Sequence, residues 1–212
     1  MSRMLKDMYR IEAILFDLDG VLVDACGWHY RALNEALLFY KKPIIEYQEH
    51  LKTYNGLPTL KKLNMLGIAE DLANKINDAK QEFTLDIIKK NARLMPEKIE
   101  LHKFLKQNKI KIGCVTNSIR KTTEEMLKTT EQFEYMDIII CNEDVKQNKP
   151  SPDCYNLAIK TLNVNPLNVL CVEDSEKGIM SVTSSIAKHL LIVKNTHEVN
   201  VTNIQNKLKE IL

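Results

Sequence analysis

Hydrophobic residues along the chain gather in short continuous runs, separated by segments in which they recur every three or four positions. Continuous runs are typical of strands covered on both faces of a parallel sheet, whereas the longer spacing indicates helices with one buried face. The runs that predict strands are Ile11 to Phe16, Ile110 to Val115, Ile138 to Cys141, Val169 to Val172 and Leu190 to Val193. Strands that alternate with helices predict an α/β fold with a doubly wound, Rossmann-like parallel sheet.

The segment between the first and second predicted strands is too long for a single crossover helix. Within it, Trp28 to Tyr40 and Leu72 to Ile87 carry helical spacing, and Asn55 to Leu60 predicts a turn that opens a shorter helix. We therefore expect an inserted all-helical cap domain at residues 25–92. Residues 1–24 and 93–212 would then form the α/β catalytic core.

Polar side chains follow three of the predicted strands directly. They are Asp17 and Asp19 after the first strand, Thr116, Asn117 and Ser118 after the second, and Glu173, Asp174 and Ser175 after the fourth. In open α/β sheets, ligands bind just beyond the carboxyl ends of the strands. We therefore expect these side chains, together with Lys149, to converge on one crevice. Helix capping would account for any one of these groups, but not for all of them.

The residue types indicate the chemistry of this crevice. Its acidic side chains are Asp17, Asp19, Glu173 and Asp174. Together they concentrate more negative charge than a fold tolerates without a counterion, and hard oxygen ligands at this density are typical of Mg²⁺. A magnesium ion and Lys149 would offset the charge of a transferring phosphoryl group while a carboxylate attacks in line. The attacking carboxylate would form an aspartyl-phosphate intermediate.

Composition excludes several other classes of protein. The 212 residues include 30 basic and 28 acidic side chains, which leaves a net charge of +2. This balance is not typical of proteins that bind nucleic acid or anionic membranes, and no apolar run approaches the length of a membrane span. Five cysteines without a C-x-x-C spacing argue against a disulfide framework and against zinc. We expect a cytoplasmic protein whose partner is a small-molecule phosphate ester, with no nucleic-acid or membrane partner. The oligomeric state stays open.

Four short stretches resemble the motifs of the haloacid dehalogenase superfamily of phosphotransferases, in the branch with a helical cap after the first strand. They are FDLDGVLVD (Phe16–Asp24), VTNS (Val115–Ser118), KPSPD (Lys149–Asp153) and VEDSEKGI (Val172–Ile179). The resemblance extends from Ile11 to Val193. It implies a Mg²⁺-dependent phosphatase that hydrolyses a small phosphorylated metabolite.

The resemblance also implies roles for individual residues. Asp17 would be the nucleophile and Asp19 the general acid and base, with Thr116 and Lys149 completing the catalytic set. The implied metal site consists of Asp17, the main-chain carbonyl of Asp19 and Asp174, supported by Glu173. The residues expected to bind substrate or phosphate are Asn117, Gly20 (which lets the chain turn sharply away from the site), Ser118 and, from the first cap helix, His29.

Three other activities are compatible with parts of this pattern. The closest is a mutase resembling β-phosphoglucomutase, whose family carries a hydroxyl residue at the cap hinge where this chain has Ala25, so the sequence favours hydrolysis. A haloalkanoate dehalogenase needs no second aspartate to protonate an alkoxide, and Asp19 is present. A phospho-accepting receiver domain would carry its aspartate after the third strand, where this chain has Cys141 and Asn142.

Overall fold

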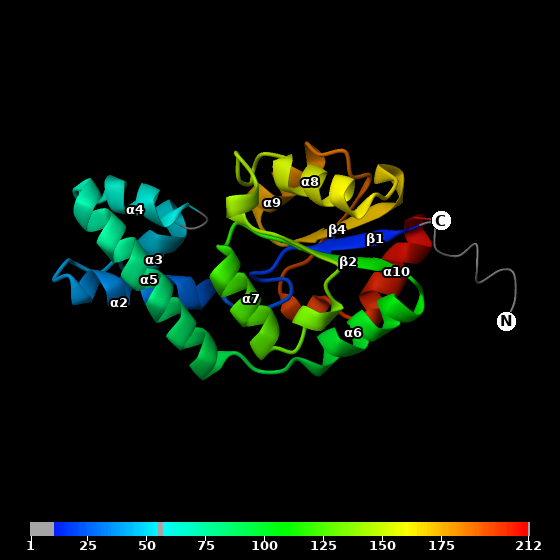
Figure 1. Ribbon diagram of the computed structural model, residues 1–212, viewed down its shortest axis with the longest axis horizontal. Helices are drawn as coiled ribbons and strands as arrows, with labels where there is room; N and C mark the ends of the chain where they lie inside the picture. Colours follow the sequence, from blue (N-terminus) through cyan, green and yellow to red (C-terminus); the bar gives the residue numbers. More distant parts are fainter. Residues whose placement is uncertain (1–10, 55–56, 212) are drawn as a thin grey trace, which may run out of the picture. The chain divides into compact units, whose positions relative to one another are not determined.

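The computed structural model describes residues 11–54 and 57–211, and Figure 1 shows the arrangement of its elements. The strands are β1 (Ala13–Phe16), β2 (Lys111–Val115), β3 (Ile138–Ile140), β4 (Val169–Glu173) and β5 (His189–Ile192). The helices between β1 and β2 are α2 (Cys26–Phe39), α3 (Tyr47–Glu49), the π-helical turn η1 (His50–Tyr54), α4 (Thr59–Met65), α5 (Glu70–Asn91) and α6 (Pro96–Gln107). The later helices are α7 (Arg120–Thr129), α8 (Asp153–Leu162), α9 (Glu176–Thr183) and α10 (Val201–Ile211). Short 3₁₀ turns are η2 (Phe133–Tyr135), η3 (Asn142–Asp144), η4 (Pro166–Asn168) and η5 (Thr196–Glu198).

The five strands form one parallel sheet in the order β3-β2-β1-β4-β5. In the register, Phe16 of β1 lies beside Cys114 of β2 and Val172 of β4. The chain builds outward from β1 to β3 and then returns to the other side of β1 with β4. This reversal places the topological switch point, where open α/β sheets bind their ligands, at the carboxyl ends of β1 and β4, with β2 beside β1.

The central strands are buried because helices cover both faces of the sheet. All residues of β1 and β4 are buried, as the continuous hydrophobic runs predict, whereas β5 at the sheet edge is only half-buried or exposed. Figure 1 shows α8 and α9 on one face and α6, α7 and α10 on the other. The predicted doubly wound α/β fold with a helical insertion is confirmed.

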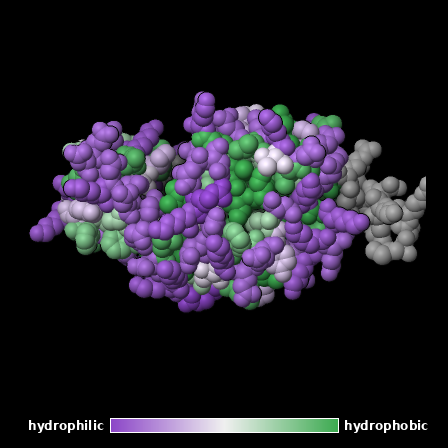
Figure 2. All heavy atoms as spheres, in the orientation of Figure 1, coloured by the Kyte–Doolittle hydropathy of each residue, from purple (hydrophilic) through white to green (hydrophobic). Residues whose placement is uncertain are grey.

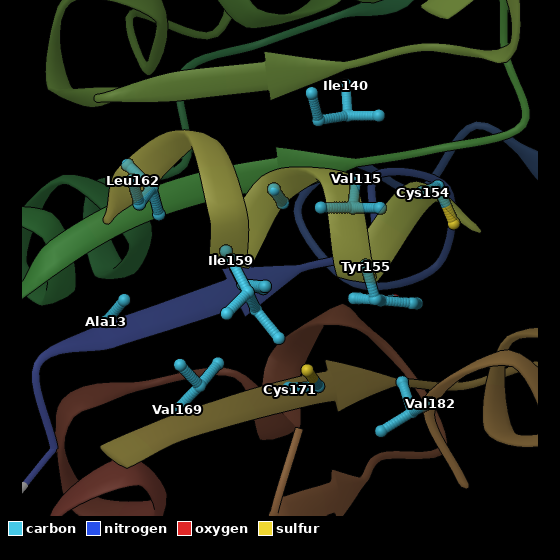
Figure 3. Packing of buried hydrophobic residues seen from close by; sticks show 12 residues of the cluster. Ala13, Val115, Ile140, Cys154, Tyr155, Ile159, Leu162, Val169, Cys171 and Val182 are labelled. Carbon is cyan, nitrogen blue, oxygen red and sulfur yellow. The ribbon is translucent and has the colours of Figure 1, made fainter. Parts of the chain in front are cut away.

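Helix α8 covers the middle of one sheet face. Figure 3 shows its side chains Tyr155 and Ile159 directed at the strands, with Cys171 of β4 beneath them. Cys114, Cys141 and Cys171 are buried as expected, and Cys154 is buried as well. These thiols behave as small apolar side chains within the core.

Contacts between residues divide the chain into two compact units. One unit comprises Met1–Asp24 with Arg93–Leu212, and the other comprises Ala25–Ala92. Within the second unit, α2 packs along α5, and the buried side chains of Leu33, Leu37 and Ile76 form the centre of a separate hydrophobic core. The insertion therefore has a core of its own.

Element boundaries differ from the sequence expectations by one to four residues. Strand β1 begins at Ala13 rather than Ile11, and α2 begins at Cys26 rather than Trp28. The expected turn at Asn55 to Leu60 falls partly outside the described residues, although α4 does begin at Thr59. Ends of this kind depend on the last hydrogen bond, which hydrophobic spacing does not specify.

The molecular surface agrees with the composition. On the face drawn in Figure 2, hydrophilic side chains dominate, and hydrophobic side chains gather toward the middle of the α/β unit. Among the described residues, no helix combines the length and the apolar content that crossing a bilayer requires.

Candidate active site

The site begins where β1 ends. The N–H of Asp17 donates to the carbonyl of Val172 over 3.0 Å, so Asp17 still lies in line with β4. The chain then reverses at once, because the Leu18 carbonyl accepts hydrogen bonds from the N–H groups of Leu22 and Val23, each at 2.9 Å. This segment, Leu18–Val23, is called the catalytic turn below. It leaves Asp17 buried and Asp19 half-exposed.

Gly20 in the catalytic turn has a φ of 88°, a conformation that side chains disfavour. A Cβ atom at this position would also overlap the carboxylate of Asp174. The sequence predicts Gly20 as a residue that lets the chain turn and as part of the phosphate-binding set. Its sharp turn is present, and its absent side chain makes room for Asp174.

Lys149 joins two of the carboxylates. Its Nζ lies 2.5 Å from Oδ1 of Asp17 and 2.6 Å from Oε1 of Glu173, and it also donates to the carbonyl of Val115 at 2.7 Å. These three acceptors use all three protons of the ammonium group. Burial alone would lower the pKa of Lys149, but the carboxylates of Asp17 and Glu173 raise it above its ordinary value. Lys149 is therefore a permanent cation in this site.

Glu173 is fully buried and held by hydrogen bonds from several directions. Besides Lys149, the Tyr155 hydroxyl donates to Oε1 over 2.8 Å, and the N–H of Asp174 donates to Oε2 over 3.1 Å. A Cβ atom on Gly178 would overlap the Glu173 carboxylate, so the first turn of α9 can approach it only through a glycine. Glu173 therefore serves as an anchor inside the protein rather than as a group offered to ligands.

The segment after β2 contributes through hydroxyl and amide groups. Oγ of Ser118 donates to Oδ2 of Asp19 over 2.9 Å, and the N–H of Ser118 donates to Oγ1 of Thr116 over 3.0 Å. Thr116 is buried. These bonds connect the second motif to the first and fix the orientation of the Asp19 carboxylate.

Asn117 uses its side chain within the protein. Its Nδ2 donates to the carbonyl of Lys149 over 3.1 Å, and its Oδ1 accepts from the N–H of Lys149 over 2.9 Å. This two-way bond aligns the backbone of Lys149. The expected contact of Asn117 with phosphoryl oxygens would thus fall to its main-chain N–H rather than to its side-chain amide.

Burial and the neighbouring carboxylates raise the pKa of two of these groups, Asp17 and Asp174. Burial raises the pKa of Asp174 to about 6, and the charge of Glu173 acts in the same direction. Burial also raises the pKa of Asp17, where the charges of Glu173 and Asp19 add to the effect and that of Lys149 opposes it. The single positive charge of Lys149 therefore does not balance the carboxylates of this site.

A divalent cation fits this deficit. One oxygen from each of Asp17, Glu173 and Asp174 can be chosen so that all lie within 4.8 Å of one another. Glu173 is already committed to Lys149 and Tyr155, which leaves Asp17 and Asp174 as side chains suited to hold the ion. An all-oxygen donor set of this kind matches the preference of Mg²⁺.

His29 belongs to the helical unit, Ala25–Ala92. It lies half-exposed in α2, and its Nδ1 is 3.2 Å from Nζ of Lys80 on α5. Its expected contact with substrate stays a prediction.

Two residues with clear contacts to the site escape the sequence analysis. Tyr155 follows helical core spacing, so its apolar ring accounts for its position, although a buried tyrosine hydroxyl usually needs a partner. Gly178 lies in the fourth motif, but nothing local indicates that a carboxylate would occupy the space of its side chain. Both depend on how α8 and α9 pack near Glu173.

Comparison with known proteins identifies the class of enzyme to which this fold and site belong. Residues 14–192 match the model of the family described as haloacid dehalogenase-like hydrolase. The chain belongs to this family. The expected family and the expectation of an enzyme are thus confirmed.

Individual relatives agree with this assignment. The chain is 29% identical over 182 residues to a phosphorylated carbohydrates phosphatase from Thermotoga maritima, covering 82% of each chain. Its structure is similar to β-phosphoglucomutase from Clostridium difficile, with a TM-score of 0.77, 26% identity and coverage of 94% of this chain and 98% of that one. It also shares its fold with the protein CbbY from Rhodobacter sphaeroides in complex with phosphate, with a TM-score of 0.78, 24% identity and coverage of 86% and 85%.

Proposed function

We propose that this protein is a Mg²⁺-dependent phosphatase that hydrolyses small phosphate esters through an aspartyl phosphate formed on Asp17. The observation that carries the proposal is the position of Lys149, whose ammonium group bridges Asp17 and Glu173 at the switch point of the sheet. A buried cation beside a buried carboxylate suits a reaction in which that carboxylate attacks an anionic phosphoryl group.

In the first step, a carboxylate oxygen of Asp17 attacks phosphorus and the bond to the ester oxygen breaks. Lys149 offsets charge on the phosphoryl oxygens, and the main-chain N–H of Asn117 and the Thr116 hydroxyl are suited to contact them. Asp19 gives its proton to the departing alkoxide. Ser118 supports this role because its hydroxyl holds Oδ2 of Asp19.

In the second step, Asp19 takes a proton from a water molecule that attacks the aspartyl phosphate. The bond between phosphorus and Asp17 then breaks, which releases inorganic phosphate, restores the Asp17 carboxylate and leaves Asp19 protonated for the next cycle. The same group acts first as acid and then as base, as a single half-exposed carboxylate can.

Asp17 and Asp174 would hold Mg²⁺, together with the main-chain carbonyl of Asp19. The ion, when bound, supplies positive charge that orients the phosphoryl oxygens. Gly20 supports this arrangement because its missing side chain lets Asp174 approach the catalytic turn.

Phosphorylated carbohydrates are the substrate class that we propose first. The support is the Thermotoga maritima relative, whose name describes that class. A panel of sugar phosphates, nucleotides and phosphoglycolate, assayed for phosphate release with Mg²⁺, tests this proposal. Release from no member by wild-type protein, or equal release by Asp17→Asn, would contradict it.

A phosphosugar mutase is the second candidate, favoured by the likeness to β-phosphoglucomutase from Clostridium difficile. A mutase must protect its aspartyl phosphate from water, and its family carries a hydroxyl residue where this chain has Ala25. Ala25 precedes the first residue of α2 and has no side-chain hydrogen bond to that helix. The absence of a hinge hydroxyl favours hydrolysis.

One assay separates the two candidates. The protein is supplied with β-glucose 1-phosphate and a catalytic trace of the corresponding bisphosphate, and both products are followed. We expect free phosphate to exceed glucose 6-phosphate. Glucose 6-phosphate that accumulates much faster than phosphate would establish the mutase instead.

A further inference from the structure

A buried polar network reaches the catalytic turn from outside the four motifs. The side chain of Gln132 is fully buried between α7 and η2. Its Nε2 donates to the main-chain carbonyl of Leu22 over 3.1 Å and to Oγ1 of Thr130 over 3.0 Å. Its Oε1 lies 2.9 Å from Nε2 of His102 on α6. Leu22 is part of the catalytic turn, so Gln132 binds the segment that carries Asp19.

The orientation of the Gln132 amide follows from its partners. The Leu22 carbonyl can only accept a hydrogen bond, so the amide nitrogen must face it. The amide oxygen must then accept from His102, which assigns the ring proton to Nε2. Burial lowers the pKa of His102 to about 4, so the ring is neutral at pH 7 and holds this single tautomer. His102 therefore fixes the direction of the Gln132 amide.

The backbone of Gln132 is also fixed. Two hydrogen bonds close the end of helix α7. The N–H of Gln132 donates to the carbonyl of Leu127 over 2.8 Å, and the N–H of Glu131 donates to the carbonyl of Lys128 over 3.1 Å. Glu131 takes the left-handed conformation, with a φ of 58°. This is the Schellman ending of a helix, and it delivers Gln132 to one position relative to α7.

The same network touches the other end of the Asp17–Asp19 segment. The ring of His102 lies edge-on to Phe16, the residue before Asp17, with 6.2 Å between ring centres. His102 thus contacts the residue before Asp17, and Gln132 bonds to Leu22, three residues after Asp19. Leu22 is followed in the catalytic turn by Val23. The N–H of Val23 donates to the carbonyl of Leu18, and its carbonyl accepts from the N–H of Gly20.

We propose that Gln132 is a positioning residue for Asp19, acting through the Leu22 carbonyl, and that His102 sets the orientation of its amide. The proposal rests on the role of Asp19 as general acid and base in the proposed function. Ser118 orients the Asp19 side chain directly, whereas Gln132 holds the backbone on which that side chain is mounted.

The physical reason is the need to satisfy a buried carbonyl. A buried carbonyl without a donor is unfavourable, so without Gln132 the turn would shift until Leu22 found another partner. A general acid transfers its proton efficiently only within hydrogen-bond distance of the leaving oxygen, so a small displacement of Asp19 reduces the rate of proton transfer. An apolar side chain at position 132 would fill the same space without holding the turn.

The test compares Gln132→Met with Lys98→Met. Methionine has a volume close to that of glutamine but no donor. Lys98 is a matched control because it is also fully buried in the α/β unit, where its Nζ donates to the carbonyls of Thr196 and Val199 and not to the catalytic turn.

The first measurement is kcat/KM for glucose 6-phosphate and for p-nitrophenyl phosphate. The sugar leaving group needs a proton from Asp19, whereas p-nitrophenolate does not. Gln132→Met should lower kcat/KM for the sugar ester by about tenfold to a hundredfold and leave the value for p-nitrophenyl phosphate within about twofold. Lys98→Met should change neither value. Equal losses for both esters, or no loss for either, would overturn the positioning role.

The second measurement is amide hydrogen exchange in the catalytic turn of the Mg²⁺-loaded protein. In Gln132→Met, exchange at Gly20 and Val23 should accelerate about fivefold to tenfold relative to Lys98→Met, the effect of losing one hydrogen bond of ordinary strength. Unchanged exchange would refute the tie between Gln132 and the turn. If wild-type protein hydrolysed neither ester, the proposed function would fail, while the exchange rates would still decide whether Gln132 holds the turn.

Discussion

The ammonium group of Lys149 donates to the carboxylate of Asp17 over 2.5 Å, although 132 residues separate them in the sequence. The same group reaches Glu173, so one cation holds together two buried carboxylates, one directly after β1 and one at the end of β4. Burying two carboxylates at this depth without a cation would be strongly unfavourable. The pairing therefore stabilises the fold and the site at once.

Removing this cation should destabilise the protein. In Lys149→Met, two buried carboxylates lose their partner, and we expect the free energy of unfolding to fall by about 3 to 5 kcal/mol. Urea unfolding in the presence of chelator measures the change. The control is Lys128→Met, which removes an exposed ion pair with Glu124 and should cost less than about 1 kcal/mol. Similar losses in the two variants would refute the central role of Lys149.

Gly178 should not tolerate a side chain. In Gly178→Ala the methyl group would overlap the Glu173 carboxylate, so α9 or Glu173 must move and stability should fall by about 1 to 3 kcal/mol. Gly27→Ala is the matched control, because a Cβ atom there has no neighbour within 4 Å and alanine favours the helix by up to about 1 kcal/mol. Thermal unfolding of both variants gives the comparison, and a stable Gly178→Ala would show that the site can relax.

Magnesium should restore activity to chelator-treated protein, and calcium should be a poor substitute. Calcium accepts more ligands and looser geometry, which would misplace Asp17. Because burial and Glu173 raise the pKa of Asp174 to about 6, protons should compete with Mg²⁺ below that pH and weaken its binding. Titration calorimetry at pH 5 and pH 8 measures the difference. Full turnover in excess chelator, or pH-independent binding, would contradict the metal site.

Substitution of the two aspartates of the first motif should impair different steps of the reaction. Asp17→Asn lacks the nucleophile, so no phosphoenzyme should form with any donor. Asp19→Asn keeps the nucleophile but loses proton transfer, which is worth roughly 10²–10⁴-fold. It should therefore accumulate phosphoenzyme from p-nitrophenyl phosphate, whose leaving group needs no proton. Mass spectrometry of acid-quenched protein detects the adduct, and equal yields from both variants would contradict the assigned roles.

His102 should make the protein sensitive to mild acid. Burial lowers its pKa from 6.5 to about 4, so between these values the unfolded chain binds a proton that the folded protein does not. Stability from this group is complete above pH 6.5 and decreases as the pH falls toward 4, by at most about 3 kcal/mol. His102→Leu should flatten this part of the stability curve, measured by urea unfolding from pH 4 to pH 8. The exposed His197 supplies the control His197→Gln, which should keep the wild-type slope.

The sequence by itself determines the strands, the helical insertion and the positions of the four motifs. Continuous hydrophobic runs specify strands that are buried on both faces, and the polar groups that follow them mark the ligand-binding edge of the sheet. Asp17 and Gly20 are recognisable because their constraints are local. An aspartate directly after a buried strand and a glycine at a sharp reversal need only their neighbours in the chain to be interpreted.

Only the tertiary structure decides which polar atoms meet. The sequence indicates only that Tyr155 is a core residue. The packing of α8 on the sheet brings its hydroxyl to Glu173. The Asn117 side chain binds the backbone of Lys149, and Gln132 binds the carbonyl of Leu22, 110 residues away. Hydrophobic periodicity specifies which face of an element is buried, but hydrogen bonds depend on positions within a few tenths of an ångström. Those positions are set by packing between elements that are distant in the chain.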